Sequence, residues 1–330
     1  MISRRKVVGL LGTSALAVPY TSFAQPPPPP RPVRIGFLIP AYASSYASRV
    51  EALRAGLRDL GYVEGKNLAI DFRWADGKYD RLPGLALELV RLNVDVIVTG
   101  GTPGTRAAKQ ASAEIPIVMA VSGDAVATGL IASLARPGGN VTGTTYFDPE
   151  LHAKRLELLK EAIPRITRVG ALFNPANPQT MGTTLQRLRL AAESLKLELP
   201  LFEARSPGDF DGAFSAMAKR RVDAVAIVDD PMFLGNLPAI ANLAANTRVP
   251  STGAKEFAEA GGLIGYGVDF AGTFRRAAYF VDRIVRGAKP GDLPVEQATT
   301  FELVINGRTA RALGVTIPQH LLPRVDRMIE

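Results

Sequence analysis

The chain has no cysteine, only two histidines and a single tryptophan among its 330 residues. Without cysteine it can form no disulfide bond, no thiolate zinc site and no cysteine nucleophile. His152 and His320 lie far apart in the sequence and form no metal-ligand spacing such as HxxxH. Because His152 is part of the charged run HAKRLELLKE, we expect it on the solvated face of a helix.

The motifs of the common enzyme classes are also missing. The sequence has no GxSxG nucleophile elbow, no recognisable triad order and no GxxxxGK[ST] phosphate loop. Pairs of acidic residues could serve an exported hydrolase, but no other feature supports that alternative. We therefore expect a protein that is not an enzyme and that uses no cofactor and no metal.

Charge of one sign is not concentrated anywhere. The chain has 39 basic and 31 acidic residues, which gives a formal net charge of +8. Arg4, Arg5 and Lys6 belong to the N-terminal segment described next, so the remainder carries only +5. Basic and acidic residues are interspersed, and no basic stripe is interleaved with aromatic residues. We therefore expect no nucleic-acid partner.

Residues 1–24 have the three parts of an export signal. A basic start precedes an apolar run with small residues, and Ser22-Phe23-Ala24 is a small-x-small cleavage site. We expect cleavage after Ala24 and a periplasmic protein, exported by the general secretory route or by the twin-arginine route. A retained anchor is the alternative, although Pro19 interrupts the apolar run and the run is short for a membrane span. Residues 25–32 then form a proline-rich linker.

From residue 33 onward, short β-rich runs alternate with amphipathic helical stretches. Such alternation is typical of α/β proteins with parallel sheets and right-handed crossovers. The predicted strands are 33–39, 68–74, 94–99, 115–121, 141–145, 168–173, 199–204, 222–228, 249–253, 262–267 and 299–305. The predicted helices are 45–61, 82–92, 103–113, 126–134, 150–163, 179–195, 209–220, 232–246, 254–260, 270–286, 308–313 and 319–329.

These elements form two series of similar size, and a chain of this length exceeds what one hydrophobic core usually accommodates. A further helix and strand follow the second series, so the chain must pass between two lobes more than once. We expect a multi-strand hinge near Thr144, Gly265 and Thr300. The predicted parts are a signal peptide (1–24), a linker (25–32), a first lobe (33–145 plus 267–297) and a second lobe (146–266 plus 298–330).

Candidate ligand-binding residues follow the strands, because parallel α/β sheets bind ligands beyond the carboxyl ends of their strands. Thr99 ends the third predicted strand, and Gly101 and Thr102 open the helix after it. Amide groups at that helix start, together with the Thr102 hydroxyl, could hold a carboxylate, or Thr102 could simply cap the helix. Ser122 and Asp124 follow the next strand, where Asp124 is either an ammonium ligand or another cap.

The second series offers a pair of acids at a strand end, Asp229 and Asp230, with the same two alternatives. Three tyrosines lie near the ends of strands or the expected crossovers, namely Tyr42, Tyr146 and Tyr266. Aromatic rings in these places could enclose an apolar or aromatic ligand, or they could pack the hinge. If one end of the cleft holds an anion and the acids hold a cation, the ligand is a zwitterion such as an amino acid.

Several stretches of the mature chain also resemble a known family. They are LRDLGYVEGKNLAIDFRWADGKYDRLPGLALELVRLNVDVIVTGGTP, IPIVMAVSGDAVATGLIASLARPGGNVTG, KRLELLKEAIP, FNPANP, FAEAGGLIGYGVDF and KPGDLPVEQATTFELVINGRTARALGVTIP. Between about residue 33 and residue 325 the chain resembles the ABC-transporter substrate-binding protein family, whose characterised relatives include binders of aromatic amino acids.

The resemblance implies a type I periplasmic binding protein, with two Rossmann-like lobes joined by three crossovers. It also implies a small-molecule ligand, such as an amino acid, and an inner-membrane ABC permease with a cytoplasmic ATPase as partner. The ligand-facing loops would be those after Ile39, around 99–102, 122–124 and 229–230, and around Tyr266. We expect a monomer. The alternative is an exported ligand sensor that docks on a membrane receptor without transport.

Overall fold

A computed structural model describes residues 31–146, 148–178 and 180–330. The predicted signal peptide, its cleavage site and most of the proline-rich linker lie outside these residues. In the part of the chain that is described, no helix has both the length and the apolar character needed to cross a membrane.

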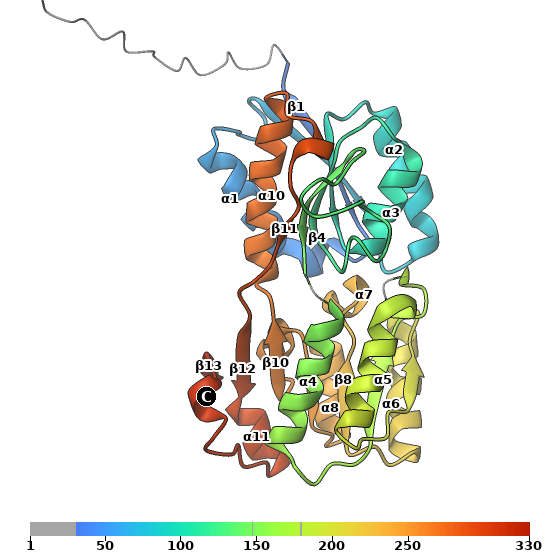
Figure 1. The fold of residues 1–330 in the computed structure, drawn as a ribbon, viewed down its shortest axis with the longest axis vertical. Helices are drawn as coiled ribbons and strands as arrows, with labels where there is room; N and C mark the ends of the chain where they lie inside the picture. Colours follow the sequence, from blue (N-terminus) through green and yellow to red (C-terminus); the bar gives the residue numbers. More distant parts are fainter. Residues whose placement is uncertain (1–30, 147, 179) are drawn as a thin grey trace, which may run out of the picture. The chain divides into compact units, whose positions relative to one another are not determined.

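The first lobe is built on a six-stranded sheet in the order β11-β5-β4-β3-β1-β2, with every pair of neighbours parallel (Figure 1). Its strands are β1 (Val33–Ile39), β2 (Leu68–Trp74), β3 (Val96–Gly100), β4 (Ile117–Ser122), β5 (Val141–Thr145) and β11 (Glu296–Gln297). Its helices are α1 (Ala47–Asp59), α2 (Leu82–Arg91), α3 (Thr102–Ala111) and α10 (Phe270–Val285).

The apolar run of β1 is explained by helices on both faces of this sheet. Ile35 and Phe37 pack in one core with α1 and α10, and Leu38 packs in another with α2 and α3. A strand covered on both faces needs apolar residues at consecutive positions rather than at alternate ones. Because α10 comes late in the sequence and still packs on this sheet, the chain has to return to the first lobe.

The second lobe is built on a seven-stranded sheet in the order β13-β12-β10-β9-β8-β6-β7. Its strands are β6 (Val169–Phe173), β7 (Leu201–Glu203), β8 (Ala224–Ile227), β9 (Ser251–Gly253), β10 (Ile264–Gly267), β12 (Glu302–Asn306) and β13 (Arg327–Ile329). Its helices are α4 (Asp148–Ala162), α5 (Leu185–Ser194), α6 (Phe210–Lys219), α7 (Pro231–Leu234), α8 (Leu237–Asn246), α9 (Lys255–Glu259) and α11 (Gly307–Leu313).

Three connections join the lobes: β5 to α4, β10 to α10, and β11 to β12. In the second sheet β10 and β12 are the only antiparallel pair among the described strands. The reason is that β10 runs toward the first lobe, whereas β12 comes back from it. The predicted fold class, two α/β lobes with mostly parallel sheets and a hinge of three crossovers, is confirmed. The predicted lobe boundaries and hinge positions stay predictions.

Two predicted helices are wrong. Residues 126–134 form turns, in which Gly129 has a φ of 71° and Lys109 Nζ donates to the carbonyl groups of Gly129 and Leu130. Residues 319–329 contain one short 3-10 helix and then β13, which pairs in parallel with β12. In both segments tertiary hydrogen bonds determine the backbone, and local helix propensity does not show them.

Two other predicted helices are interrupted. The predicted helix 232–246 is divided into α7 and α8 at Gly235 and Asn236. Pro238 lies in the first turn of α8. Proline favours the first turn of a helix, so this residue marks a new start. The predicted helix 179–195 begins with a π-helical turn over Thr180–Thr184 before α5.

Candidate functional site

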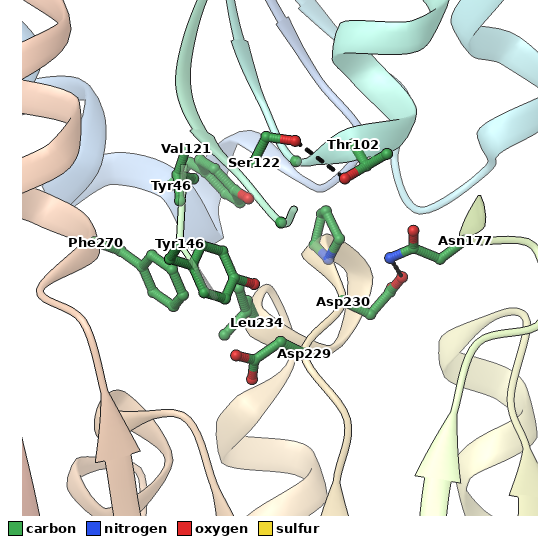
Figure 2. A pocket seen from close by; sticks show the side chains of 13 residues that line it. Tyr46, Thr102, Val121, Ser122, Tyr146, Asn177, Asp229, Asp230, Leu234 and Phe270 are labelled. Carbon is green, nitrogen blue, oxygen red and sulfur yellow. Dashed lines mark hydrogen bonds between the residues drawn. The ribbon is translucent and has the colours of Figure 1, made fainter. Parts of the chain in front are cut away.

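The described chain has a small cavity between the ends of the two sheets, with a free volume of about 30 Å³. Figure 2 shows the side chains of Thr102 and Ser122 together on one side and those of Asp229 and Asp230 on the other. The first lobe contributes Tyr46, Gly101, Thr102, Val121, Ser122, Gly123, Tyr146 and Phe270. The second lobe contributes Asn177, Asp229, Asp230, Pro231 and Leu234.

The first-lobe wall is the start of α3. Gly101 precedes this helix with a φ of 82° and a ψ of 155°, and no side chain caps the first turn. The hydroxyl groups of Thr102 and Ser122 lie 3.1 Å apart, and both side chains are buried. Amide groups at a helix start and the positive end of its dipole favour an anion, and hydroxyl groups can donate to it. This wall is therefore suited to a carboxylate.

Asp230 lies on the opposite wall and is only 1% exposed. Its carboxylate accepts hydrogen bonds from the Tyr79 hydroxyl at 2.7 Å, from the side chains of Asn174 at 3.3 Å and Asn177 at 2.9 Å, and from the Met232 amide at 3.0 Å. None of these donors is charged, and no lysine or arginine of the described chain forms an ion pair with this carboxylate. Burial raises the pKa of Asp230, although the hydrogen bonds oppose that shift.

The hydrogen bond from Tyr79 also joins the two lobes, because Tyr79 precedes α2 of the first lobe and Asp230 precedes α7 of the second. The ring of Tyr79 packs beside the second-lobe cluster that contains Met232 and Phe233. Burial holds the pKa of Tyr79 well above its usual value, and the neighbouring carboxylate adds to the shift. Asp230 therefore faces the cavity and also takes part in closing the cleft.

Asp229 has a charged partner. Arg155, on α4, donates to both of its carboxylate oxygens, at 2.8 and 2.9 Å, and both side chains are almost fully buried. The Asp229 amide donates to Nε2 of His152 at 3.2 Å. His152 is only 2% exposed, so the expectation of a solvated histidine is wrong. The outer face of α4 is formed by Lys154 and Glu157 instead, whose ion pair is partly exposed.

Apolar groups form the remaining wall. The rings of Tyr146 and Phe270 meet edge to face with centroids 5.9 Å apart, and Tyr46 and Leu234 line the same cavity. Arg49 lies over the rings of Tyr46 and Phe270, at 4.6 and 5.6 Å from their centroids. Aromatic walls of this kind pack well against a flat apolar group. The cavity thus combines one anion-binding side, one anionic side and an aromatic side.

Six of the ten sequence-predicted residues line this cavity, and four do not. The six are Gly101, Thr102, Ser122, Tyr146, Asp229 and Asp230, and their contact with a ligand stays a prediction.

The four others have structural partners elsewhere. Asp124 accepts hydrogen bonds from the amides of Val126 and Ala127, and Thr99 is bonded to the Thr105 hydroxyl at 2.7 Å. The carbonyl group of Tyr42 accepts a hydrogen bond from the Ser45 hydroxyl, and the ring of Tyr266 packs against Phe301. Asp124 therefore caps a turn, and the predicted helix after it does not form.

Seven of the lining residues are not among the ten predicted ones, and they include Tyr46, Asn177, Leu234 and Phe270. Tyr46, an aromatic candidate in the sequence, and Phe270 lie at the starts of α1 and α10, where ligands are expected. Asn177 lies in the turn after β6, where the same rule applies, but the Asn-Pro sequence there equally indicates a plain turn. No group of three potential metal ligands occurs among the described residues.

Comparisons with known proteins find similar sequences and folds. Residues 35–329 match the family described as ABC transporter substrate binding protein. A tyrosine-binding protein of Clostridioides difficile is 28% identical over 261 residues, which cover 78% of this chain and 74% of that protein.

Two solved structures are also similar. A conserved domain protein from Vibrio cholerae is 29% identical with a TM-score of 0.83, over 90% of this chain and 100% of that chain. An ABC domain from Streptococcus pneumonia in complex with L-Trp is 26% identical with a TM-score of 0.81, over 89% of this chain and 100% of that chain.

Proposed function

The chain belongs to the ABC transporter substrate-binding protein family, and from this premise we propose that it binds an aromatic amino acid for import. The ligand would bind at the cavity between the lobes, which must move apart to admit it. An inner-membrane ABC permease with a cytoplasmic ATPase is the partner that receives it. Export to the periplasm and a monomeric state belong to the same proposal.

The observation that carries the proposal is the distribution of charge around the cavity. Asp229 is neutralised by Arg155, whereas Asp230 is buried beside neutral donors only. A buried charge is stable when it is paired, so the Asp230 side of the cavity favours a cationic group. The start of α3 on the opposite wall favours an anionic group. A zwitterionic amino acid supplies both groups.

The aromatic side of the cavity supports the choice of side chain. Tyr46, Tyr146 and Phe270 surround the space between the two polar walls. Two relatives agree with this choice: one is a tyrosine-binding protein, and the other was solved in complex with L-Trp. We therefore propose tyrosine, tryptophan or phenylalanine as the ligand.

A thermal-shift screen of the purified protein against the twenty amino acids tests this function. Ligand that binds only the folded protein raises its free energy of unfolding by about 2.7 kcal/mol at a hundred times Kd. We expect an aromatic amino acid to give the largest rise in Tm, and scattering should then report a smaller radius of gyration. A shift with aliphatic or acidic amino acids alone, or with none of the twenty, would contradict the proposal.

A further inference from the structure

Arg155 is as deeply buried as Asp230, with 1% of its surface exposed. Its guanidinium group contacts two other elements of the second lobe. Both terminal nitrogens donate to the carboxylate of Asp229, and Nε donates to the carbonyl group of Tyr266 at 2.7 Å. Arg155 lies on α4, Tyr266 on β10, and Asp229 directly after β8. One side chain therefore ties three elements together.

The surroundings are shaped to accept this side chain. A Cβ atom at Gly267 would lie 3.0 Å from a terminal nitrogen of Arg155, so a larger residue there would crowd the guanidinium group. His152, three residues earlier on α4, accepts from the amide of Asp229, and its Nδ1 lies 3.2 Å from the other terminal nitrogen of Arg155. Two residues of α4 thus bind Asp229: His152 contacts its backbone, and Arg155 contacts its carboxylate.

From these contacts we infer that Arg155 is a positioning residue of the ligand site. It orients Asp229 at the cavity wall, where the carboxylate helps to hold the ammonium group of the ligand. Each oxygen of Asp229 accepts one N–H from Arg155, and a carboxylate oxygen has room for a second donor. This role rests on the proposed function, because it requires a cationic group in the ligand.

Arg155 also connects the site with the hinge. Helix α4 follows the first crossover directly, and β10 ends where the second crossover begins. Phe270, which lines the cavity, lies just beyond that second crossover. An arginine that forms two parallel hydrogen bonds with a carboxylate is a rigid connection, because the planar guanidinium group fixes the orientation of the carboxylate as well as its distance. Movement of Asp229 on ligand binding would therefore reach two of the three connections between the lobes.

The charges around Asp229 determine what happens when Arg155 is removed. Asp230 is adjacent in sequence, and Glu256 lies within electrostatic range of Asp229 and of the cations Arg49 and Lys255. Burial raises the pKa of Glu256, and the charge of Asp229 adds to that shift. A buried carboxylate that loses its directly bonded cation takes up a proton more readily. Without Arg155, Asp229 should therefore lose its charge as the pH falls.

The test is calorimetric titration with L-tyrosine and L-tryptophan between about pH 5 and about pH 8. Protonation of a single group can change the affinity at most about tenfold per pH unit. We expect wild-type affinity to change by less than about threefold over this range. In Arg155→Met, binding should be at least about tenfold weaker at the acidic end than at the basic end. The double variant Arg155→Met/Asp229→Asn should bind weakly at every pH, because the titrating carboxyl group is gone.

Arg155→Lys is the matched control, because lysine keeps the positive charge but lacks the planar guanidinium group that forms two hydrogen bonds with Asp229. We expect it to bind at least about tenfold more weakly than wild type without a new pH dependence. Wild-type affinity in Arg155→Lys, or a flat profile in a folded Arg155→Met, would overturn the inference. A pH dependence that persists in the double variant would assign the titration to another group, such as Asp230 or Glu256, and would overturn the inference as well. Failure of the proposed function is a separate result, since wild type itself would then bind neither amino acid.

Discussion

Replacement of Asp230 by alanine should weaken ligand binding by more than roughly 30-fold, since a charged group buried without its partner costs about 2–5 kcal/mol. Wild-type Asp230 is 1% exposed and has only neutral hydrogen-bond donors, so a ligand ammonium group would be its one cationic partner among the groups described. The substitution also removes the hydrogen bond from Tyr79 across the cleft. The loss should therefore appear both in Kd and in the closure of the lobes.

Asp124→Ala is the matched control for this experiment. Asp124 follows a strand in the first lobe much as Asp230 does in the second, but it bonds to the amides of its own turn and does not line the cavity. We expect Asp124→Ala to lower the free energy of unfolding by about 1 kcal/mol and to leave Kd within about threefold. Equal affinities of Asp230→Ala and wild type, with folding verified by circular dichroism, would show that Asp230 only caps α7.

Gly101→Ala should prevent full closure of the lobes. The backbone of Gly101 has a φ of 82° and a ψ of 155°, a region that costs other residues about 1–3 kcal/mol. In addition, a Cβ atom there would lie 2.5 Å from Cγ of Pro231 in the opposite lobe. We expect affinity to fall at least about tenfold, as 1.4 kcal/mol corresponds to tenfold. The radius of gyration at saturating ligand should stay larger than that of wild type.

Two further variants separate the causes. Gly84→Ala places the same methyl group on α2, where no atom lies within 4 Å, and should bind like wild type. Pro231→Ala in the Gly101→Ala background removes the atom that clashes and should restore part of the closure. If the double variant remains as open as Gly101→Ala alone, backbone strain rather than the contact across the cleft explains the effect.

The sequence was sufficient for the fold where the physical signal is local. Strands such as β1 and β8 are short apolar runs because helices cover both faces of their sheets, and such runs are visible in the sequence. Thr102 and Ser122 were predictable for a related reason: they lie at the carboxyl ends of β3 and β4, which are neighbours in the sheet. Residues that end adjacent parallel strands must come together at one edge.

The rest depends on contacts between residues distant in sequence. Asp229 and Asp230 look equivalent in the sequence, but Arg155, 74 residues before Asp229, pairs with only one of them. His152 lies in a charged run, yet its side of α4 faces the end of β8 and is buried. A short stretch of sequence shows neither which residue pairs with an acid nor which side of a polar helix is buried. These assignments therefore required the structure.

The most direct test of the account is calorimetric titration of wild type with an aromatic amino acid and with two analogues, each lacking one charged group. For L-tyrosine the analogues are tyramine, which lacks the carboxylate, and 3-(4-hydroxyphenyl)propanoate, which lacks the ammonium group. If α3 holds the carboxylate and Asp230 the ammonium group, both analogues should bind at least about 30-fold more weakly, as loss of a buried charged partner predicts. Binding of either analogue as tightly as the amino acid itself would contradict a site built for both charges.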